Sequence, residues 1–176
     1  AHYVVVESKT DGPAQNYSQS VDTGLEILRS YGIELPSEPT GRQVRQEKMQ
    51  LKIALRGRSL LCLSKLPIAT DEAVLAQMKL AQITLRHMGF CKRTALMYML
   101  GYRMFRISLK KKVVTNVLPS LIMYLGAPLR SAEKYDKASL YANVGKLMLD
   151  RFPEEKGIEF IKSKCALYAQ LVPLWT

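Results

Sequence analysis

Side chains that could act as acids, bases or nucleophiles are few and scattered in this sequence. The chain has two histidines and three cysteines. A hydrolytic triad needs a histidine oriented by an acid, but His87 follows Arg86, and the other histidine lies in the N-terminal tail. A catalytic thiol needs a basic partner, which Lys92 and Arg93 could give to Cys91. The simpler interpretation is an ordinary cysteine in a turn and a surface or capping histidine.

Motifs for binding phosphate, for paired-carboxylate chemistry or for base stacking are weak. The segment 145–147 reads Gly-Lys-Leu inside a helical pattern, without the hydroxyl and the preceding glycine of a phosphate loop. The carboxylate pairs 71–72 and 154–155 are adjacent, so their side chains diverge on a helix. One aromatic stripe could stack bases but is more typical of a core: Tyr98, Tyr102 and Phe105. We therefore expect a chain without catalytic residues, cofactor or metal site, and not an enzyme.

Composition predicts a globular intracellular domain. Hydrophobic residues make up 48% and charged residues 23% of 176 residues, which is typical of soluble proteins. No apolar run approaches the roughly 18 to 20 residues of a membrane helix. Three widely spaced cysteines, Cys62, Cys91 and Cys165, indicate neither a disulfide framework nor a zinc site. We expect a reducing, cytoplasmic setting.

The charge is strongly basic and unevenly distributed. Lysine and arginine number 26 against 15 acidic residues, for a net charge of +11. Between residues 86 and 112 every charged side chain is basic, and between 42 and 58 Glu47 is the only acid. Such runs fit a solvated face or a surface that docks on an acidic neighbouring domain. Binding of anionic lipid or nucleic acid is the alternative interpretation. No known nucleic-acid motif accompanies them.

Helical spacing groups these basic residues into two candidate binding surfaces for a protein partner. One set shares a side of the helix after Thr40, at separations of three, seven and four: Arg42, Arg45, Lys52 and Arg56. The other set is expected to point outward from a helix over 92–110: Arg103, Arg106 and Lys110. We take the second set as the strongest candidate contact for an acidic surface.

The first part of the chain predicts two helices. The first, over 18–31, buries a stripe and ends at Gly32: Val21, Leu25 and Leu28. Pro36 and Pro39 then enforce an extended link. Thr40 caps the second helix, whose stripe leads to Gly57 and an apolar stretch over 60–63: Val44, Leu51 and Leu55.

The centre of the chain predicts an antiparallel hairpin. Thr70 is the expected N-cap of a helix that ends at Gly89 and buries one stripe: Val74, Met78, Ala81, Leu85 and Met88. Its wet side is expected to carry four polar residues: Glu72, Lys79, Gln82 and Arg86. The helix over 92–110 should bury a second stripe: Tyr98, Tyr102, Phe105 and Leu109. So short a connection requires antiparallel packing.

Three further elements follow. Residues 113–115 are interpreted as a loop, and Asn116 as the cap of a helix with Pro119 in its first turn. A helix from 136 is expected to bury Leu140, Val144 and Leu147, and a last one runs from 157 to Pro173. Hairpin starts near 71, 116 and 157 give a period of roughly 40 to 45 residues, typical of helical repeats. The predicted fold is all-α, with antiparallel hairpins stacked as a tetratricopeptide-like α-solenoid.

Several segments resemble the helical region that follows the P-loop module in large predicted ATPases and multi-sensor signalling kinases. The similar segments keep their order over about residues 20 to 176 and consist mostly of packing residues: 24–36, 63–67, 70–71, 75–83, 103–109, 124–126, 145–152 and Trp175. The resemblance implies a non-catalytic tetratricopeptide-like array within a cytoplasmic signalling protein, with an ATPase upstream. Lys110–Lys112 departs from the family, and no family catalytic residue falls in this chain.

The expected organisation is a tail, or the end of a preceding unit, over 1–17 and one helical-repeat domain over 18–176. The chain starts without methionine and ends on Leu-Trp-Thr, so we expect a piece of a longer protein. Its expected function is to mediate protein–protein or interdomain contacts. A basic helical nucleic-acid-binding protein is the alternative.

Overall fold

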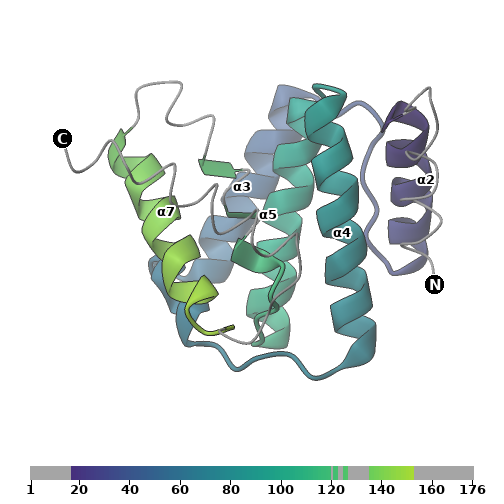
Figure 1. Ribbon diagram of the computed structural model, residues 1–176. Coiled ribbons are helices and arrows are strands. Elements are labelled where there is room, and N and C mark those ends of the chain that lie inside the picture. Colours follow the sequence, from purple (N-terminus) through teal and green to yellow (C-terminus); the bar gives the residue numbers. More distant parts are fainter. Residues whose placement is uncertain (1–16, 120, 123–124, 127–134, 153–176) are drawn as a thin grey trace.

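The computed structural model describes residues 17–119, 121–122, 125–126 and 135–152, and over these residues the fold is all-α (Figure 1). The elements are listed in chain order: α2 (Tyr17–Ser30), α3 (Gly41–Leu55), the 3-10 helix η1 (Leu60–Lys65), α4 (Glu72–Phe90), α5 (Thr94–Lys111) and α7 (Tyr135–Leu149). An isolated β-bridge joins Ile68 to Val114, and within the described ranges no longer strand forms. The predicted fold class is therefore confirmed at the level of all-α.

The ends of α2 and α3 follow the predicted local chemistry. Gly32 adopts a φ of 77°, the left-handed conformation that a glycine tolerates best after a helix. Thr40 forms a capping box at the start of α3: its side chain accepts from the backbone N–H of Gln43 at 3.3 Å, and its own N–H donates to the Gln43 side chain at 2.8 Å. Both boundaries therefore come from local sequence.

The predicted cap of α4 is wrong by one residue. The N-cap is Asp71, not Thr70, because the Asp71 carboxylate accepts a hydrogen bond from the N–H of Ala73 at 2.9 Å. A carboxylate at this position also lies favourably in the positive end of the helix dipole. At the other end, α4 continues past Gly89 to Phe90.

The helices do not pack in the order of the chain. α2 packs on α4, α4 on α5, and α5 on α3. Contacts of Tyr17 with Phe90 and of Tyr31 with Gln77 make α2 and α4 antiparallel, whereas α3 and α5 descend together from the same end of the bundle (Figure 1). Helices α2, α3 and α5 thus run the same way and α4 runs against them. The extended link over 31–40 makes this possible, because it carries the chain back along the bundle between α2 and α3.

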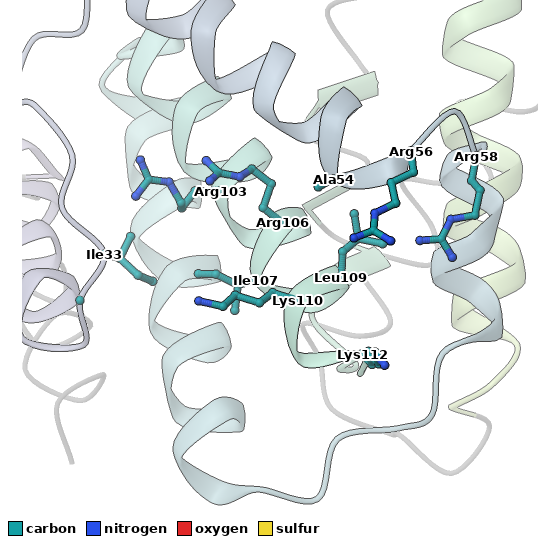
Figure 2. Close-up of a pocket in the computed structure, with 11 residues that line it drawn as sticks. Ile33, Ala54, Arg56, Arg58, Arg103, Arg106, Ile107, Leu109, Lys110 and Lys112 are labelled. Carbon is teal, nitrogen blue, oxygen red and sulfur yellow. The ribbon is translucent and has the colours of Figure 1, made fainter.

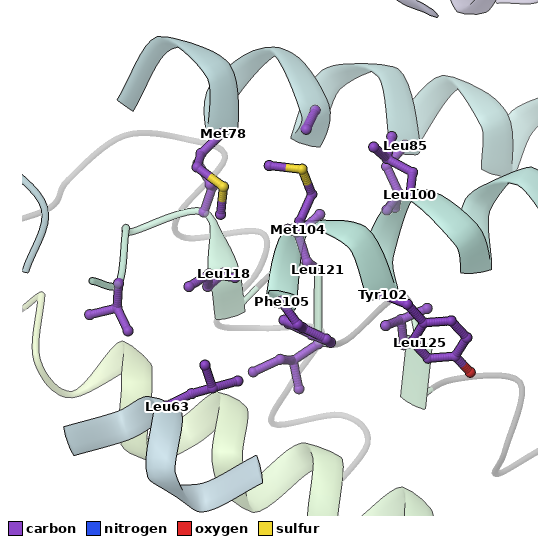
Figure 3. Close-up of a cluster of buried hydrophobic side chains, with 14 of the residues drawn as sticks. Leu63, Met78, Leu85, Leu100, Tyr102, Met104, Phe105, Leu118, Leu121 and Leu125 are labelled. Carbon is purple, nitrogen blue, oxygen red and sulfur yellow. The ribbon is translucent and has the colours of Figure 1, made fainter. Parts of the chain in front are cut away.

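The predicted α4–α5 hairpin is confirmed, with a connection over 91–93. All five residues of the predicted α4 stripe are buried, and they join Phe105, Leu118 and Leu121 in one core (Figure 3). Gln82 is only 8% exposed, so its predicted place on the wet side is wrong. On α5, Tyr102 and Phe105 are buried as expected, while Tyr98 and Leu109 are half-buried.

Close approach of α2 to α4 depends on one glycine. A Cβ added at Gly24 would lie 2.4 Å from the Oγ1 of Thr84, which is itself buried and donates to the carbonyl of Leu80 at 2.9 Å. Distances below 3.0 Å are not seen for real Cβ atoms. Gly24 is therefore a packing requirement of the α2–α4 contact.

The sequence placed α7 correctly but rotated its buried face. Val144 is buried as predicted, yet Leu140 is 37% and Leu147 is 47% exposed. The residues that pack inward are Val144 and Met148, and η1 is an element that α7 contacts. Near its end, Arg151 donates to the carbonyl oxygens of Ser64, at 2.8 Å, and of Leu66.

Residues 113–115 form a connection, as predicted, although Val114 and Thr115 are buried. The chain becomes helical again at Leu118, and Pro119 lies in that first turn. Other predictions fall outside the described residues: the tail over 1–16, the carboxylate pair 154–155, Cys165, the last helix from 157 and the third hairpin start.

Candidate functional site

His87 is not the surface or capping side chain that the sequence suggested. It is 1% exposed, its ring lies 5.4 Å from that of Tyr17, and its Nδ1 has no hydrogen-bond partner in the described part of the chain. Burial, and secondarily the charge of Arg86, lowers the pKa of His87 to about 4. A neutral histidine packed among aromatic rings serves the α2–α4 contact.

The other candidates for chemistry also occupy structural positions. Burial raises the pKa of the Cys91 thiol, with Arg93 opposing and Asp22 supporting the shift, whereas nucleophilic cysteines have a lowered pKa. Arg93 itself donates to Asp22 at 2.6 Å and to Ser18 at 2.9 Å, joining the hairpin turn to α2. Lys146 is exposed in the last turn of α7, and its segment is helical and not a phosphate loop.

The most informative polar cluster joins α3 to α5. Glu47, 4% exposed, accepts hydrogen bonds from the Nε and Nη2 of Arg103 on one oxygen, the Nε bond being 2.8 Å long. Its other oxygen accepts from the Nη1 of Arg106 at 2.6 Å. The arginine side chains are 26% and 30% exposed. Glu47 therefore holds two guanidinium groups in fixed positions, each with further N–H donors to spare.

These two arginines form one side of an open pocket of about 640 Å³, which we call the basic pocket (Figure 2). Its charged lining residues are all basic: Arg56, Arg58, Arg103, Arg106, Lys110 and Lys112. Its remaining lining residues are small or apolar: Gly32, Ile33, Ala54, Ile107 and Leu109. Figure 2 shows Arg103 and Arg106 side by side, with Arg56 and Arg58 across the pocket from them. The pocket thus collects cations from α5 and from the residues that follow α3 and α5.

Two of these cations stand where glycine is the usual residue. Arg56 and Lys112 are the C-caps of α3 and α5, with φ values of 50° and 56° in the left-handed region. A residue with a Cβ costs roughly 1 kcal/mol or more in this conformation. Lysine and arginine near a helix C-terminus offset part of that cost by their favourable interaction with the helix dipole. Arg58 also contributes to the cap, since its Nε donates to the carbonyl of Leu55 at 3.1 Å.

The second basic set lies on a different surface, which we call the outer face of α3. All of its residues are exposed: Arg42, Arg45, Met49, Lys52, Ile53 and Arg56. Met49 is 58% and Ile53 67% exposed, and among the described residues Phe90, at 60%, is the other large apolar side chain more than half exposed. Glu47 and Leu51, on the opposite side of the helix, are buried. The outer face is therefore an apolar pair surrounded by cations.

The structure divides the sequence-predicted site residues between these two surfaces. Arg42, Arg45 and Lys52 lie on the outer face of α3; Arg103, Arg106 and Lys110 line the basic pocket; Arg56 belongs to both. Arg103 and Arg106 were predicted to point freely outward, but Glu47 binds both of them. The sequence analysis missed Arg58 and Lys112 as pocket residues, and Glu47 as the carboxylate that binds Arg103 and Arg106. One signal for Glu47 was present, since it fills the gap between Val44 and Leu51 in the apolar stripe of α3.

Comparison with protein-family models, with curated proteins and with solved structures finds no match to this chain. Among the described residues no group of histidine, cysteine and carboxylate side chains is placed to bind a metal ion. No helix in these ranges has the length and hydropathy needed to cross a bilayer.

Proposed function

We propose that this chain is a non-catalytic helical module that binds an acidic protein surface, on a neighbouring domain or on another protein, through the outer face of α3. The observation that supports it most directly is the exposure of Met49 and Ile53 within a ring of cations. Protein interfaces commonly have an apolar centre with a polar rim, and charge complementarity speeds association and selects the partner. The expected partner surface is therefore apolar at its centre and acidic around it.

The resemblance to signalling ATPases and kinases supports a place for this module in a multidomain cytoplasmic protein, where it would transmit or receive contacts. Stacked hairpins of a tetratricopeptide-like solenoid are part of the proposal, and the α4–α5 hairpin supports them. α2 and α3 are not paired as such a hairpin, because each packs on a helix further along the chain. The outer face of α3 lies at the end of this helix row, where an added unit would meet it.

Protein is favoured over nucleic acid by the apolar pair. Phosphate contacts of nucleic acids are made by cations and polar groups, and they give no reason to expose Met49 and Ile53 together. Nucleic-acid binding by the same cations is the alternative function, and the experiment below distinguishes the two.

A photo-crosslinking amino acid at Met49 tests the proposal in cells that express the full polypeptide. The control places the same amino acid at Leu147, which is 47% exposed on α7. We expect a protein adduct from position 49 alone, with the crosslink mapped by mass spectrometry to an acidic segment. A nuclease-sensitive adduct would support the alternative, and identical adducts from both positions would contradict a specific surface.

Once the crosslink has been mapped, the purified partner or neighbouring domain is titrated with charge-reversal variants of this chain. Arg45→Glu with Lys52→Glu should weaken binding by about tenfold or more, since both residues lie on the outer face. The matched control, Lys137→Glu with Lys146→Glu, makes the same charge change on exposed positions of α7. Equal losses in both variants would assign the effect to net charge and not to the outer face.

A further inference from the structure

We infer that the basic pocket is a second, separate site that binds a compact polyphosphate group, such as that of a nucleoside triphosphate or an inositol polyphosphate. The pocket lies where α3 and α5 end, with Ile33 of the segment after α2 also in its lining. It shares only Arg56 with the outer face of α3. Its ligand class follows from charge, from fixed geometry and from size.

The charge of the pocket exceeds what the fold itself requires. Glu47 offsets one cation, and the C-terminal ends of α2, α3 and α5 each contribute about half a negative charge. The six basic lining residues therefore keep a surplus of about 3.5 positive charges after both offsets. In the described ranges no other acid pairs with Arg56, Lys110 or Lys112. A single carboxylate or phosphate leaves most of this surplus unmatched, whereas a chain or cluster of phosphates balances it.

The geometry of two guanidinium groups is set before a ligand arrives. Both oxygens of Glu47 are engaged by Arg103 and Arg106, so the carboxylate is turned away from an incoming anion by its own hydrogen bonds. Planar guanidinium groups bind phosphate through paired N–H donors. Because Glu47 has already ordered these side chains, anion binding loses less side-chain entropy.

The two strained caps, Arg56 and Lys112, also support a binding site at the pocket. At the ends of α3 and α5 a glycine would relieve the backbone, yet Arg56 and Lys112 occupy these positions, and both line the pocket. Strained residues often mark functional sites. Lys92 provides an internal comparison: it has the same left-handed backbone, with a φ of 56°, but lies in the α4–α5 turn, about 27 Å away along α5.

The size of the pocket suits a ligand larger than a phosphate ion. A volume of about 640 Å³ falls within the roughly 300 to 1,000 Å³ of small-molecule sites. The side chains of Ile33, Ile107 and Leu109 add apolar lining between the cations, against which the non-phosphate part of a ligand can pack. These properties favour a phosphorylated small molecule over a free inorganic ion.

Isothermal titration calorimetry with the whole chain in about 150 mM salt tests this site. Tripolyphosphate is the basic probe, sulfate is the single-anion control, and ATP and inositol hexakisphosphate distinguish the two sources of the phosphate group. We expect saturable one-to-one binding of tripolyphosphate, weaker binding of sulfate, and tighter binding of whichever organic polyphosphate fits the apolar lining.

Glycine substitutions at the left-handed positions separate binding from folding. Arg56→Gly and Lys112→Gly each remove a pocket cation while relieving the backbone, so thermal stability should hold or rise as tripolyphosphate affinity falls by about tenfold. Lys92→Gly makes the same backbone change and loses the same charge outside the pocket, and its affinity should stay within about twofold of wild type. Lys110→Gln, at an exposed position, is a further pocket variant that leaves the backbone unchanged.

Several results would overturn the assignment. Sulfate binding as tight as tripolyphosphate binding would remove the need for linked phosphates. An equal loss of affinity in Lys92→Gly and Arg56→Gly would show that net charge, not the pocket, attracts the anion. Displacement of tripolyphosphate by a short DNA duplex at lower concentration would assign these cations to nucleic acid. Failure of the site leaves the protein-binding proposal intact, because the Met49 crosslinks and the Arg45 and Lys52 variants do not involve the pocket.

Discussion

The outer face of α3 and the basic pocket are both rich in arginine and lysine, but they are built differently. On the outer face, one helix supplies every residue, and the side chains project from it into solvent around Met49 and Ile53. In the pocket, cations from α5 and from the residues after α3 and α5 surround one space. A buried carboxylate, Glu47, orders two of these cations.

This difference separates two uses of positive charge. Mobile exposed cations around an apolar pair suit a broad protein surface, where steering and selection matter more than the geometry of single bonds. Cations held by hydrogen bonds and by fixed backbone suit a small anion whose charges are close together. The tests that follow ask whether the two regions differ in stability as well as in ligand.

The largest effect is expected at Glu47. Replacing it by Gln leaves Arg103 and Arg106 beside other cations without their carboxylate, and we expect a loss of about 3 kcal/mol in the free energy of unfolding. Urea denaturation measures it. The control is Glu34→Gln, which removes a 2.9 Å ion pair with Arg29 whose two side chains are 73% exposed, and which should change stability by less than about 0.5 kcal/mol. Similar small losses in both variants would show that the pocket arginines are not held by Glu47.

A pH-dependent effect of intermediate size is expected at His87, outside both basic regions. The pKa of His87 is lowered to about 4 in the folded chain. As the pH drops below about 6.5, the unfolded chain therefore takes up a proton at His87 that the folded chain does not, and the free energy of unfolding decreases. The loss attributable to this residue between pH 7 and pH 5 is about 2 kcal/mol. Lysine and arginine keep their charge over this range, so neither basic region accounts for it.

Replacement of His87 by Phe tests this assignment, because phenylalanine keeps a ring beside Tyr17 and cannot take up a proton. The variant should lose less stability than wild type between pH 7 and pH 5 in parallel urea titrations. An unchanged pH dependence would assign the acid sensitivity to another titratable group.

The smallest effect is expected on the outer face of α3. Met49→Ser with Ile53→Ser should change the free energy of unfolding by less than about 0.5 kcal/mol, because both side chains are already largely exposed. Leu51→Ala, on the buried side of the same helix at 4% exposure, should cost about 3 kcal/mol. A large loss from the serine variant would mean that these apolar residues support the fold, which would weaken the case for a docking surface.

Secondary structure could be predicted well where the signal is local. Periodic apolar residues located α2, α3, α4, α5 and α7, and Thr40 and Gly32 marked two of their ends. The errors arise where burial of a side chain depends on packing against other elements. Gln82 is buried although the apolar stripe of α4 predicts it on the exposed side, and α7, which lies against η1, presents Val144 and Met148 inward.

The candidate sites were predictable to different degrees for the same reason. Arg42, Arg45 and Lys52 share one face because helix geometry relates positions three, four and seven apart, and their exposure follows from the buried stripe on the other side. Arg103 and Arg106 have the same spacing signal, but nothing local indicates that Glu47 lies against them. That contact joins residues 56 and 59 positions apart.

The helices, the ends marked by Thr40 and Gly32 and the basic outer face of α3 could all be predicted from sequence, since they depend on interactions within a few residues. Tertiary structure decided the helix order, the burial of His87 and Gln82, and the basic pocket. The burial of His87 depends on the packing of α2 on α4. The pocket depends on the parallel course of α3 and α5, which brings their C-terminal ends together. The spacing of apolar residues does not indicate whether two helices run parallel or antiparallel, because a helix presents the same stripe to either neighbour.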